Sequence, residues 1–377
     1  MLSLYIHIPF CRKVCGYCDF FRSADHRAME RVLEVMLDEI EQRCGDSEEP
    51  FFDKRLKSIY FGGGTPSLLS CVQLARFMER IDHFFDLSML EETTLEANPD
   101  DLNLEYLRGL RELGFNRLSL GVQSFDDELL QFMGRRHSAA DAVNAIESAR
   151  RVGFDNIAID LIYGVDGFGH RLRSTLQRAN ECDVEHIAAY HLTIEPGTRF
   201  GKMVERGAMR VVDESVSESE FIMVREALVK GGFEHYEVSN FAQLGRRSIH
   251  NSNYWSGEDY IGIGAGAHSF VNGVRRWAVE SLVGYISGGE QRYGSERLTL
   301  EQRRNEMVML SLRRVEGLEL GRFESMFGVG EVGRLMEDAE RFLRVGDLVV
   351  DGDRIKIPAE RFLLSDMIIE ALFSLGE

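Results

Sequence analysis

The sequence lacks several features that mark common functional classes. No apolar run approaches the roughly 18–20 residues that a membrane-spanning helix needs, so no such helix is expected. The opening Met1-Leu2-Ser3 lacks the positive charge that begins a signal peptide, and no cleaved leader is expected. Basic residues are outnumbered, with 44 Lys and Arg against 62 Asp and Glu and a net charge of −18. This acidity argues against binding to nucleic acid or to an anionic membrane surface.

Cysteine is also scarce, with six in 377 residues, and its distribution disfavours two common roles. A disulfide framework is typical of small secreted chains. Structural zinc usually takes four protein ligands, often from two separated pairs. Here no second C-x2-C occurs, and Cys44, Cys71 and Cys182 are isolated. Reduced cysteines of this kind indicate the cytoplasm.

The other three cysteines lie close together directly after an apolar segment. Cys11, Cys15 and Cys18 form a C-x3-C-x2-C run on what is expected to be one loop. Thiolates at this spacing can hold three irons of a [4Fe-4S] cluster, which usually has four cysteine ligands. The fourth iron would keep an open coordination site, where another molecule can bind and be reduced. Zinc binding and structural thiols are the alternatives, and the ligand count favours the cluster.

The rest of the chain alternates apolar strands with amphipathic helices. Strands are predicted over residues 4–8, 58–61, 93–96, 117–121, 157–161 and 186–192, and a first helix over 28–44. Gly114 and Gly153 suit the left-handed residue that ends a helix, and the phenylalanine after each can cover the last helical turn. This order predicts an α/β fold with a parallel, curved sheet. In barrels of this kind the active site lies at the C-terminal ends of the strands.

The character of the chain changes at about residue 300. The segment is helical and charged, and then reaches an apolar run whose turn is expected at residues 351–353. A large domain over 1–295 and a small helical, winged-helix-like domain over 296–377 are predicted. Winged helices often bind DNA, but the acidity of this chain argues against that role.

The C-x3-C-x2-C motif is the signature of the radical S-adenosylmethionine (SAM) superfamily. The surrounding residues, HIPFC and then C-x-YCDF, resemble the branch that contains the anaerobic coproporphyrinogen oxidase HemN and the haem chaperone HemW. The likeness continues to FLLSDMII near the end of the chain. It implies a partial (β/α)6 barrel with a barrel-closing extension, a HemN-type C-terminal domain, a [4Fe-4S] cluster and bound SAM.

Polar residues at the predicted strand ends are the candidate SAM contacts. SAM carries a sulfonium, an amine and a carboxylate, so its site needs acceptors together with a cation or an amide. Each such residue could instead be a solvated side chain, and the glycine run after the second strand a tight turn. The resemblance implies that Gly63, Gly64 and Thr65 meet the amino group, that Tyr5 and Tyr17 pack nearby, and that Glu96, Gln123, Arg135 and Asp160 contact SAM.

A second unusual patch is HNSNYW, which begins at His250. A neutral imidazole is a good axial ligand for haem iron, and neighbouring aromatic rings could pack on the porphyrin. The patch resembles the HNxxYW motif of HemW, which implies a haem-binding role for His250. His268 and His191 are the second choices. The alternative is a buried, hydrogen-bonded histidine.

Two differences separate the branches. HemN relatives carry a further cysteine just after the triad and a long N-terminal extension, whereas here Asp19 follows Cys18 and the cluster loop begins at residue 11. The resemblance therefore implies a haem chaperone that binds a cluster, SAM and haem and delivers haem to apo-haemoproteins. A coproporphyrinogen III dehydrogenase, or another HemN-like radical SAM enzyme, is the alternative. One local departure lies in Tyr163-Gly164-Val165-Asp166. In the family, Tyr-Gly is usually followed by a bulky residue and then by proline, and here Asp166 stands in place of the proline.

The same resemblance suggests the partners. A flavodoxin- or ferredoxin-type reductant would supply one electron to the cluster, and contact with a membrane is expected only through the protein that receives haem. No nucleic-acid partner is expected, and a homodimer is compatible with the sequence.

Overall fold

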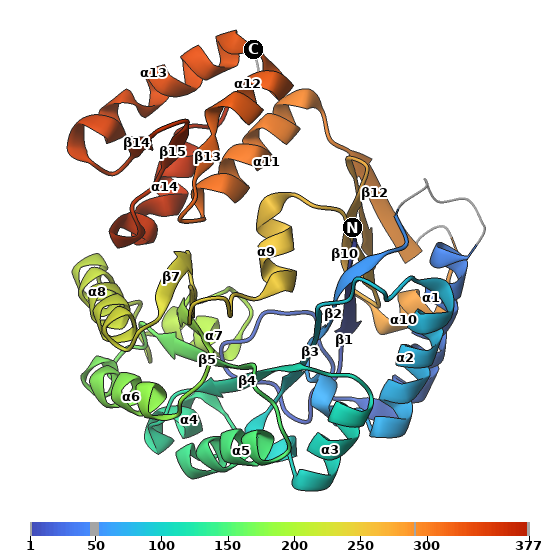
Figure 1. Ribbon diagram of the computed structural model, residues 1–377. Coiled ribbons are helices and arrows are strands. Elements are labelled where there is room, and N and C mark those ends of the chain that lie inside the picture. The colour runs from blue at the N-terminus through green and yellow to red at the C-terminus, as the bar shows by residue number, and fades with distance from the viewer. Residues whose placement is uncertain (1, 46–52, 290–291, 375–377) are drawn as a thin grey trace.

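The computed structural model describes residues 2–45, 53–289 and 292–374, and most of them surround one large curved sheet (Figure 1). All six predicted strands are present and pair in chain order as parallel neighbours. They are β1 (Leu2–Ile8), β2 (Leu56–Gly63), β3 (Glu92–Ala97), β4 (Arg117–Gln123), β5 (Ile157–Tyr163) and β6 (His186–His191). Their C-terminal ends therefore meet at one edge of the sheet.

Helices cover the convex face of this sheet in an arc (Figure 1). They include α1 (Met29–Cys44), α2 (Cys71–Phe84), α3 (Leu104–Glu112), α5 (Ala139–Arg151), α6 (Gly169–Glu181) and α8 (Glu214–Lys230). The predicted helix ends are present, because Gly114 and Gly153 have φ of +89° and +90°. The next residues, Phe115 and Phe154, are fully buried and close the helix against the following strand.

Shorter strands extend the sheet on both sides. Beside β1 lie β9 (Tyr260–Ile263), β10 (His268–Val271), β11 (Val274–Ala278) and β12 (Tyr293–Arg297), and beside β6 lie β8 (Asn240–Ala242) and β7 (Glu234–Glu237). In the described residues β12 and β7 are the two ends of the strand order, so the sheet forms no closed barrel. This confirms the predicted α/β class and the partial barrel.

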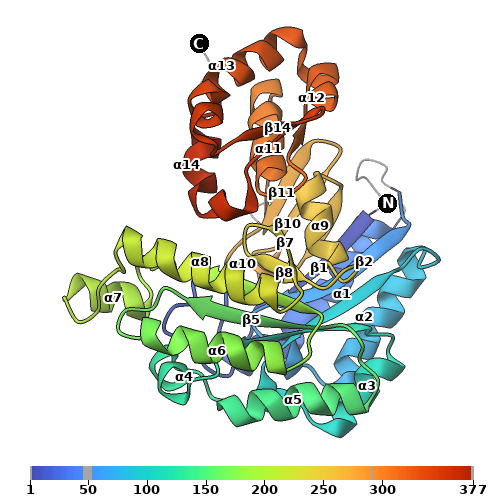
Figure 2. The ribbon, with the colours of Figure 1, turned by 60° about the vertical axis from the view of Figure 1, so that its left-hand side comes forward.

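The chain then forms a small unit that lies beyond β7 and α9 (Ile249–Ser256), as Figures 1 and 2 show. It contains α11 (Leu300–Leu312), α12 (Leu320–Phe327), α13 (Val329–Val345), α14 (Ser365–Glu370) and a three-stranded sheet of β13 (Leu318–Glu319), β15 (Arg354–Lys356) and β14 (Val349–Asp351). The predicted turn at 351–353 joins β14 to β15. The predicted domain boundary after residue 295 falls inside β12. No described helix is both long and apolar enough to cross a membrane.

Candidate cluster and cofactor site

The loop that carries Cys11, Cys15 and Cys18 follows β1 and is fixed by backbone hydrogen bonds. The Cys11 amide donates to the Ser23 carbonyl at 3.0 Å. The Gly16 amide donates to the carbonyl of Met133, the last residue of α4 (Asp127–Met133), at 2.9 Å. In turn, the Gly16 carbonyl accepts from an amide in α7 (Arg199–Glu205) at 2.9 Å. The loop is therefore anchored to two helices across the open end of the sheet.

The three thiols lie in different surroundings. The Thr65 hydroxyl donates to Cys11 Sγ at 3.4 Å, and Arg135 Nη1 donates to Cys15 Sγ at 3.4 Å. Burial raises the pKa of the Cys11 and Cys18 thiols. No three His, Cys, Asp or Glu side chains among the described residues are arranged to hold one metal ion. In a cubane each cysteine binds a separate iron, so the three thiols need not converge on one ion.

A cavity of about 390 Å³ opens beside the loop, at the C-terminal ends of the strands. Its size is in the range of small-molecule and cofactor sites. Most residues predicted from the sequence line it, namely Cys11, Cys15, Cys18, Tyr17, Gly63, Gly64, Thr65, Glu96, Gln123, Arg135 and Asp160. The structure therefore brings these side chains, from four strands and the loops beside them, to one site.

Two carboxylates give this cavity its acceptors. Glu96, near the end of β3, accepts from the Tyr60 hydroxyl at 2.8 Å and from the Gly63 amide at 3.0 Å. Burial, and then the charge of Asp160, raise the pKa of Glu96 to about 7. Burial likewise raises the pKa of Asp160 to about 6. Ionising both carboxyls is therefore costly, and a bound cation would offset that cost.

Two further side chains have buried polar atoms without a partner among the described residues. Gln123 Oε1 and Arg135 Nε make no hydrogen bond, although both side chains line the cavity. Gln123 also has φ of +66°, which non-glycine residues seldom adopt. An unpaired acceptor, an unpaired donor and two carboxylates in one cavity match a ligand that has both amine and carboxylate groups. The residues present therefore fit SAM.

The glycine run packs against β1 as well as lining the cavity. A Cβ on Gly63, whose φ is +105°, would lie 2.5 Å from the His7 ring. A Cβ on Gly64 would lie 2.7 Å from the Phe10 carbonyl oxygen. Both glycines are needed for contacts within the protein, so the tight-turn alternative already accounts for them.

His250 does not reach this cavity. It is 1% exposed and lies in the interior, stacked on Tyr60 with 4.9 Å between ring centroids. Its Nδ1 pairs with the Ser58 hydroxyl at 2.8 Å and its Nε2 with the Tyr254 hydroxyl at 3.0 Å. Burial lowers the pKa of His250 to about 3. The structure thus shows the alternative, a neutral histidine with both nitrogens already paired, and a haem-binding role for His250 stays a prediction.

Tyr5 lies beside the cavity, near Tyr60 at 6.1 Å between ring centroids, and its role at the SAM site stays a prediction. It alternates with buried Leu4 and Ile6 along β1 and points to the inner face of the sheet, where its hydroxyl pairs with His7 Nδ1 at 3.0 Å. It lines a neighbouring cavity and not the one that all three cysteines line. Tyr17 lines both.

Sequence reasoning missed several residues of the cavity. Asn98 bonds Arg135 and the Thr65 hydroxyl, and Ser119 donates to Asp160 at 3.5 Å. Tyr190 lies at the end of β6 and is 43% exposed. Both Ser119 and Tyr190 lie on predicted strands, and this was the signal that could have found them. Ser119 is a polar residue within an apolar segment, and Tyr190 is an aromatic residue near the end of a strand.

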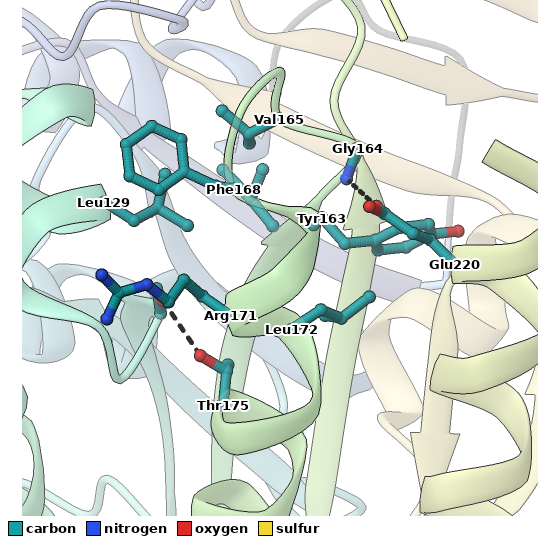
Figure 3. Close-up of a pocket in the computed structure, with 12 residues that line it drawn as sticks. Leu129, Tyr163, Gly164, Val165, Phe168, Arg171, Leu172, Thr175 and Glu220 are labelled. Carbon is teal, nitrogen blue, oxygen red and sulfur yellow. Dashed lines mark hydrogen bonds between the residues drawn. The ribbon is translucent and has the colours of Figure 1, made fainter. Parts of the chain in front are cut away.

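The loop after β5 contains the departure at Asp166. Figure 3 shows Gly164 facing Glu220, whose carboxylate accepts from the Gly164 amide at 2.8 Å. Gly164 and Gly167 have φ of +78° and +82°, and Asp166 Oδ2 accepts from the Arg210 amide at 2.9 Å. The neighbouring cavity of Figure 3 measures about 10 Å³, room for one water at most. Two glycines and the aspartate thus define the loop without proline.

Comparison with known proteins identifies the family of the chain. The Radical SAM superfamily profile matches residues 5–179, which span β1 to α6 and include the cluster loop. The chain is 37% identical to the heme chaperone HemW of Bacillus subtilis (strain 168), over 87% of each chain. It is 34% identical to heme chaperone HemW of Lactococcus lactis subsp. lactis (strain IL1403), over 98% of this chain and 96% of the relative.

The structural comparison gives the same class. The coproporphyrinogen III oxidase HemN from Escherichia coli, a radical SAM enzyme, superimposes with a TM-score of 0.84 over 100% of this chain and 90% of that one. At 23% identity this likeness concerns the fold. The matched profile and the HemN-like fold together define the class, a radical SAM protein. Within it, the chain belongs to the family of the heme chaperones HemW.

Proposed function

We propose that this protein is a haem chaperone that holds a [4Fe-4S] cluster and SAM, binds haem and delivers it to apo-haemoproteins. The observation that carries the proposal is the similarity to heme chaperones HemW over nearly the whole chain. The cavity supports it, because three cysteines, two carboxylates and two unpaired polar atoms surround one space.

Each residue then has a defined task. Cys11, Cys15 and Cys18 hold the cluster, and the Arg135 guanidinium beside Cys15 offsets the negative charge of the thiolates. Glu96 and Asp160 face the positive groups of SAM. When bound, the cluster and SAM supply one-electron chemistry, and the protein orients them and excludes water.

The proposal includes partners. A flavodoxin- or ferredoxin-type protein would supply the electron, and the cysteine loop is the place for its approach, since Lys13 and Val14 at its tip are exposed. Membrane contact would occur only through the protein that receives haem. A homodimer is compatible with the proposal.

The second candidate function is coproporphyrinogen III dehydrogenase. The observation in its favour is the superposition on HemN, and at 23% identity this extends to the fold alone. The HemW relatives match at higher identity, which favours the chaperone.

The test is an anaerobic haem transfer assay. Reconstituted protein is loaded with haem, separated from the excess and mixed with apomyoglobin, and the myoglobin Soret band is followed. The proposal expects haem to bind and then to move to apomyoglobin. Cys15→Ala, which removes a cluster ligand, is compared with Cys71→Ser, a change at an isolated cysteine. Absence of haem binding by the wild-type protein would refute the chaperone function.

A further inference from the structure

A second, larger cavity adjoins the cluster cavity. It measures about 610 Å³, and the two share Tyr17, Cys18, Phe20 and Thr193 in their walls. Aromatic rings dominate its lining, with Tyr5, Tyr17, Phe20, Phe21, Tyr254 and Tyr260. Phe20 is 70% exposed, an unusual position for a phenylalanine beside a cofactor loop. A planar aromatic ligand would cover these rings and leave its charged edge in water.

One histidine of this cavity is free to bind a metal. His268 begins β10 and is exposed, and among the described residues neither of its ring nitrogens makes a hydrogen bond. Within the described part of the chain its one ring contact is a stack on Trp277, with 6.3 Å between centroids. Partial desolvation of its ring lowers the pKa of His268, so the imidazole is neutral at pH 7 and offers a lone pair.

The other histidines named from the sequence are occupied. Both nitrogens of His250 are paired, as described above. His191 lines the cluster cavity, and its Nε2 pairs with the Ser217 hydroxyl at 3.0 Å. To bind iron, His250 would first have to break a hydrogen bond at either nitrogen, and His191 would have to break one at Nε2.

The backbone holds His268 in place. Gly266 turns the chain with φ of +79°. It also packs closely on Phe21, because an added Cβ would lie 3.2 Å from that ring. The Ala267 carbonyl accepts from the Ala278 amide at 2.9 Å, and His268 pairs with Trp277 across β10 and β11. A side chain on such a pinned strand end is pre-organised for a ligand.

We propose that this aromatic cavity binds haem and that His268 is the axial ligand of its iron. The inference rests on the proposed chaperone function and names the site for it. The lining also contains three carboxylates, Asp19, Glu195 and Glu280, of which Asp19 and Glu280 are exposed, so the propionates of a bound haem must lie in water away from them.

The same geometry gives His250 an indirect role. The HNSNYW motif reaches the cavity through Tyr254, whose hydroxyl pairs with His250 and whose ring packs edge-on against Tyr260 at 4.5 Å. His250 is thus a positioning residue that holds one aromatic wall. Its loss would weaken haem binding without changing the iron ligand.

The experiment is an anaerobic haemin titration of the reconstituted protein and its variants, followed by absorbance and electron paramagnetic resonance. His268→Ala should lose the spectrum of a histidine-ligated haem and weaken binding at least about tenfold. Added imidazole should restore the spectrum. His250→Ala should bind more weakly but keep the wild-type ligand spectrum. His83→Ala, at a histidine of α2 remote from the cavity lining, is the matched control and should behave as wild type.

The outcomes separate the two proposals. Retention of the cluster absorbance and of the melting temperature shows that each variant is folded. If wild type binds haem and His268→Ala gives the same spectrum and affinity, the inference is overturned while the chaperone function stands. Loss of the histidine-ligated spectrum in His250→Ala alone would overturn it as well. If wild type binds no haem, both proposals fail.

Discussion

Replacing Glu96 by glutamine should stabilise the protein without its ligands while weakening SAM binding. The pKa of Glu96 is raised from 4.5 to about 7 because the carboxylate is buried and faces Asp160. Between pH 4.5 and about pH 7 the folded state binds more protons than the unfolded state, so the free energy of unfolding falls as the pH rises. A tenfold change in proton affinity corresponds to about 1.4 kcal/mol, so above pH 7 the ionised group costs the fold about 3 kcal/mol.

Glutamine removes this cost and can keep both contacts. Its carbonyl can accept from the Gly63 amide, and its amide can donate to the Tyr60 hydroxyl oxygen, the two groups that now contact Glu96. We expect Glu96→Gln to raise the free energy of unfolding at pH 8 by about 2–3 kcal/mol. At pH 4.5, where the carboxyl is protonated, the gain should vanish.

The assay is urea denaturation of cluster-free, SAM-free protein at the two pH values. Glu105→Gln, at an exposed position on α3, is the matched control and should change stability little. Asp160→Asn should shrink the gain from Glu96→Gln, because the neighbouring charge helps to raise the pKa of Glu96. An equal loss of stability at both pH values would refute the reasoning, since it would show that Glu96 is stabilising as an ion.

Three other predictions concern the same cavity. In the reconstituted protein, SAM should bind about tenfold more weakly at pH 6 than at pH 8, because Glu96 must be ionised to accept from the amine; a constant Kd by calorimetry would contradict this. Cys15→Ala should lose the brown iron–sulfur absorbance after reconstitution while Cys71→Ser keeps it, and a full cluster in Cys15→Ala would remove this ligand from the assignment. Gln123→Gly should weaken SAM binding yet leave the melting temperature near wild type, since glycine relieves the positive φ; unchanged SAM affinity would show that the amide faces no ligand.

The fold was predictable because its signals are local. Gly114 and Phe115 mark a helix end through one backbone conformation and one buried ring, and both are present. Strand ends such as Glu96 and Asp160 could be placed at one edge because parallel strands point the same way. The cavity beside the cysteines follows from that edge.

The orientation of single side chains was less predictable. His250 is paired with Ser58 and Tyr254, and Ser58 comes from a strand almost two hundred residues earlier in the chain. No local pattern shows that both ring nitrogens are satisfied. The short strands β9 to β12 were also not located individually, because they pair across the sheet edge and carry little periodicity. As a result the cavity that contains His268 could not be seen from the sequence.

The most direct test of the chaperone function combines two measurements on one sample. Reconstituted protein is incubated anaerobically with SAM, a chemical reductant and coproporphyrinogen III, and a second portion is titrated with haem. We predict saturable haem binding and no formation of protoporphyrinogen. Conversion of coproporphyrinogen III without haem binding would contradict the proposed function and would make the protein an oxygen-independent enzyme of porphyrin synthesis.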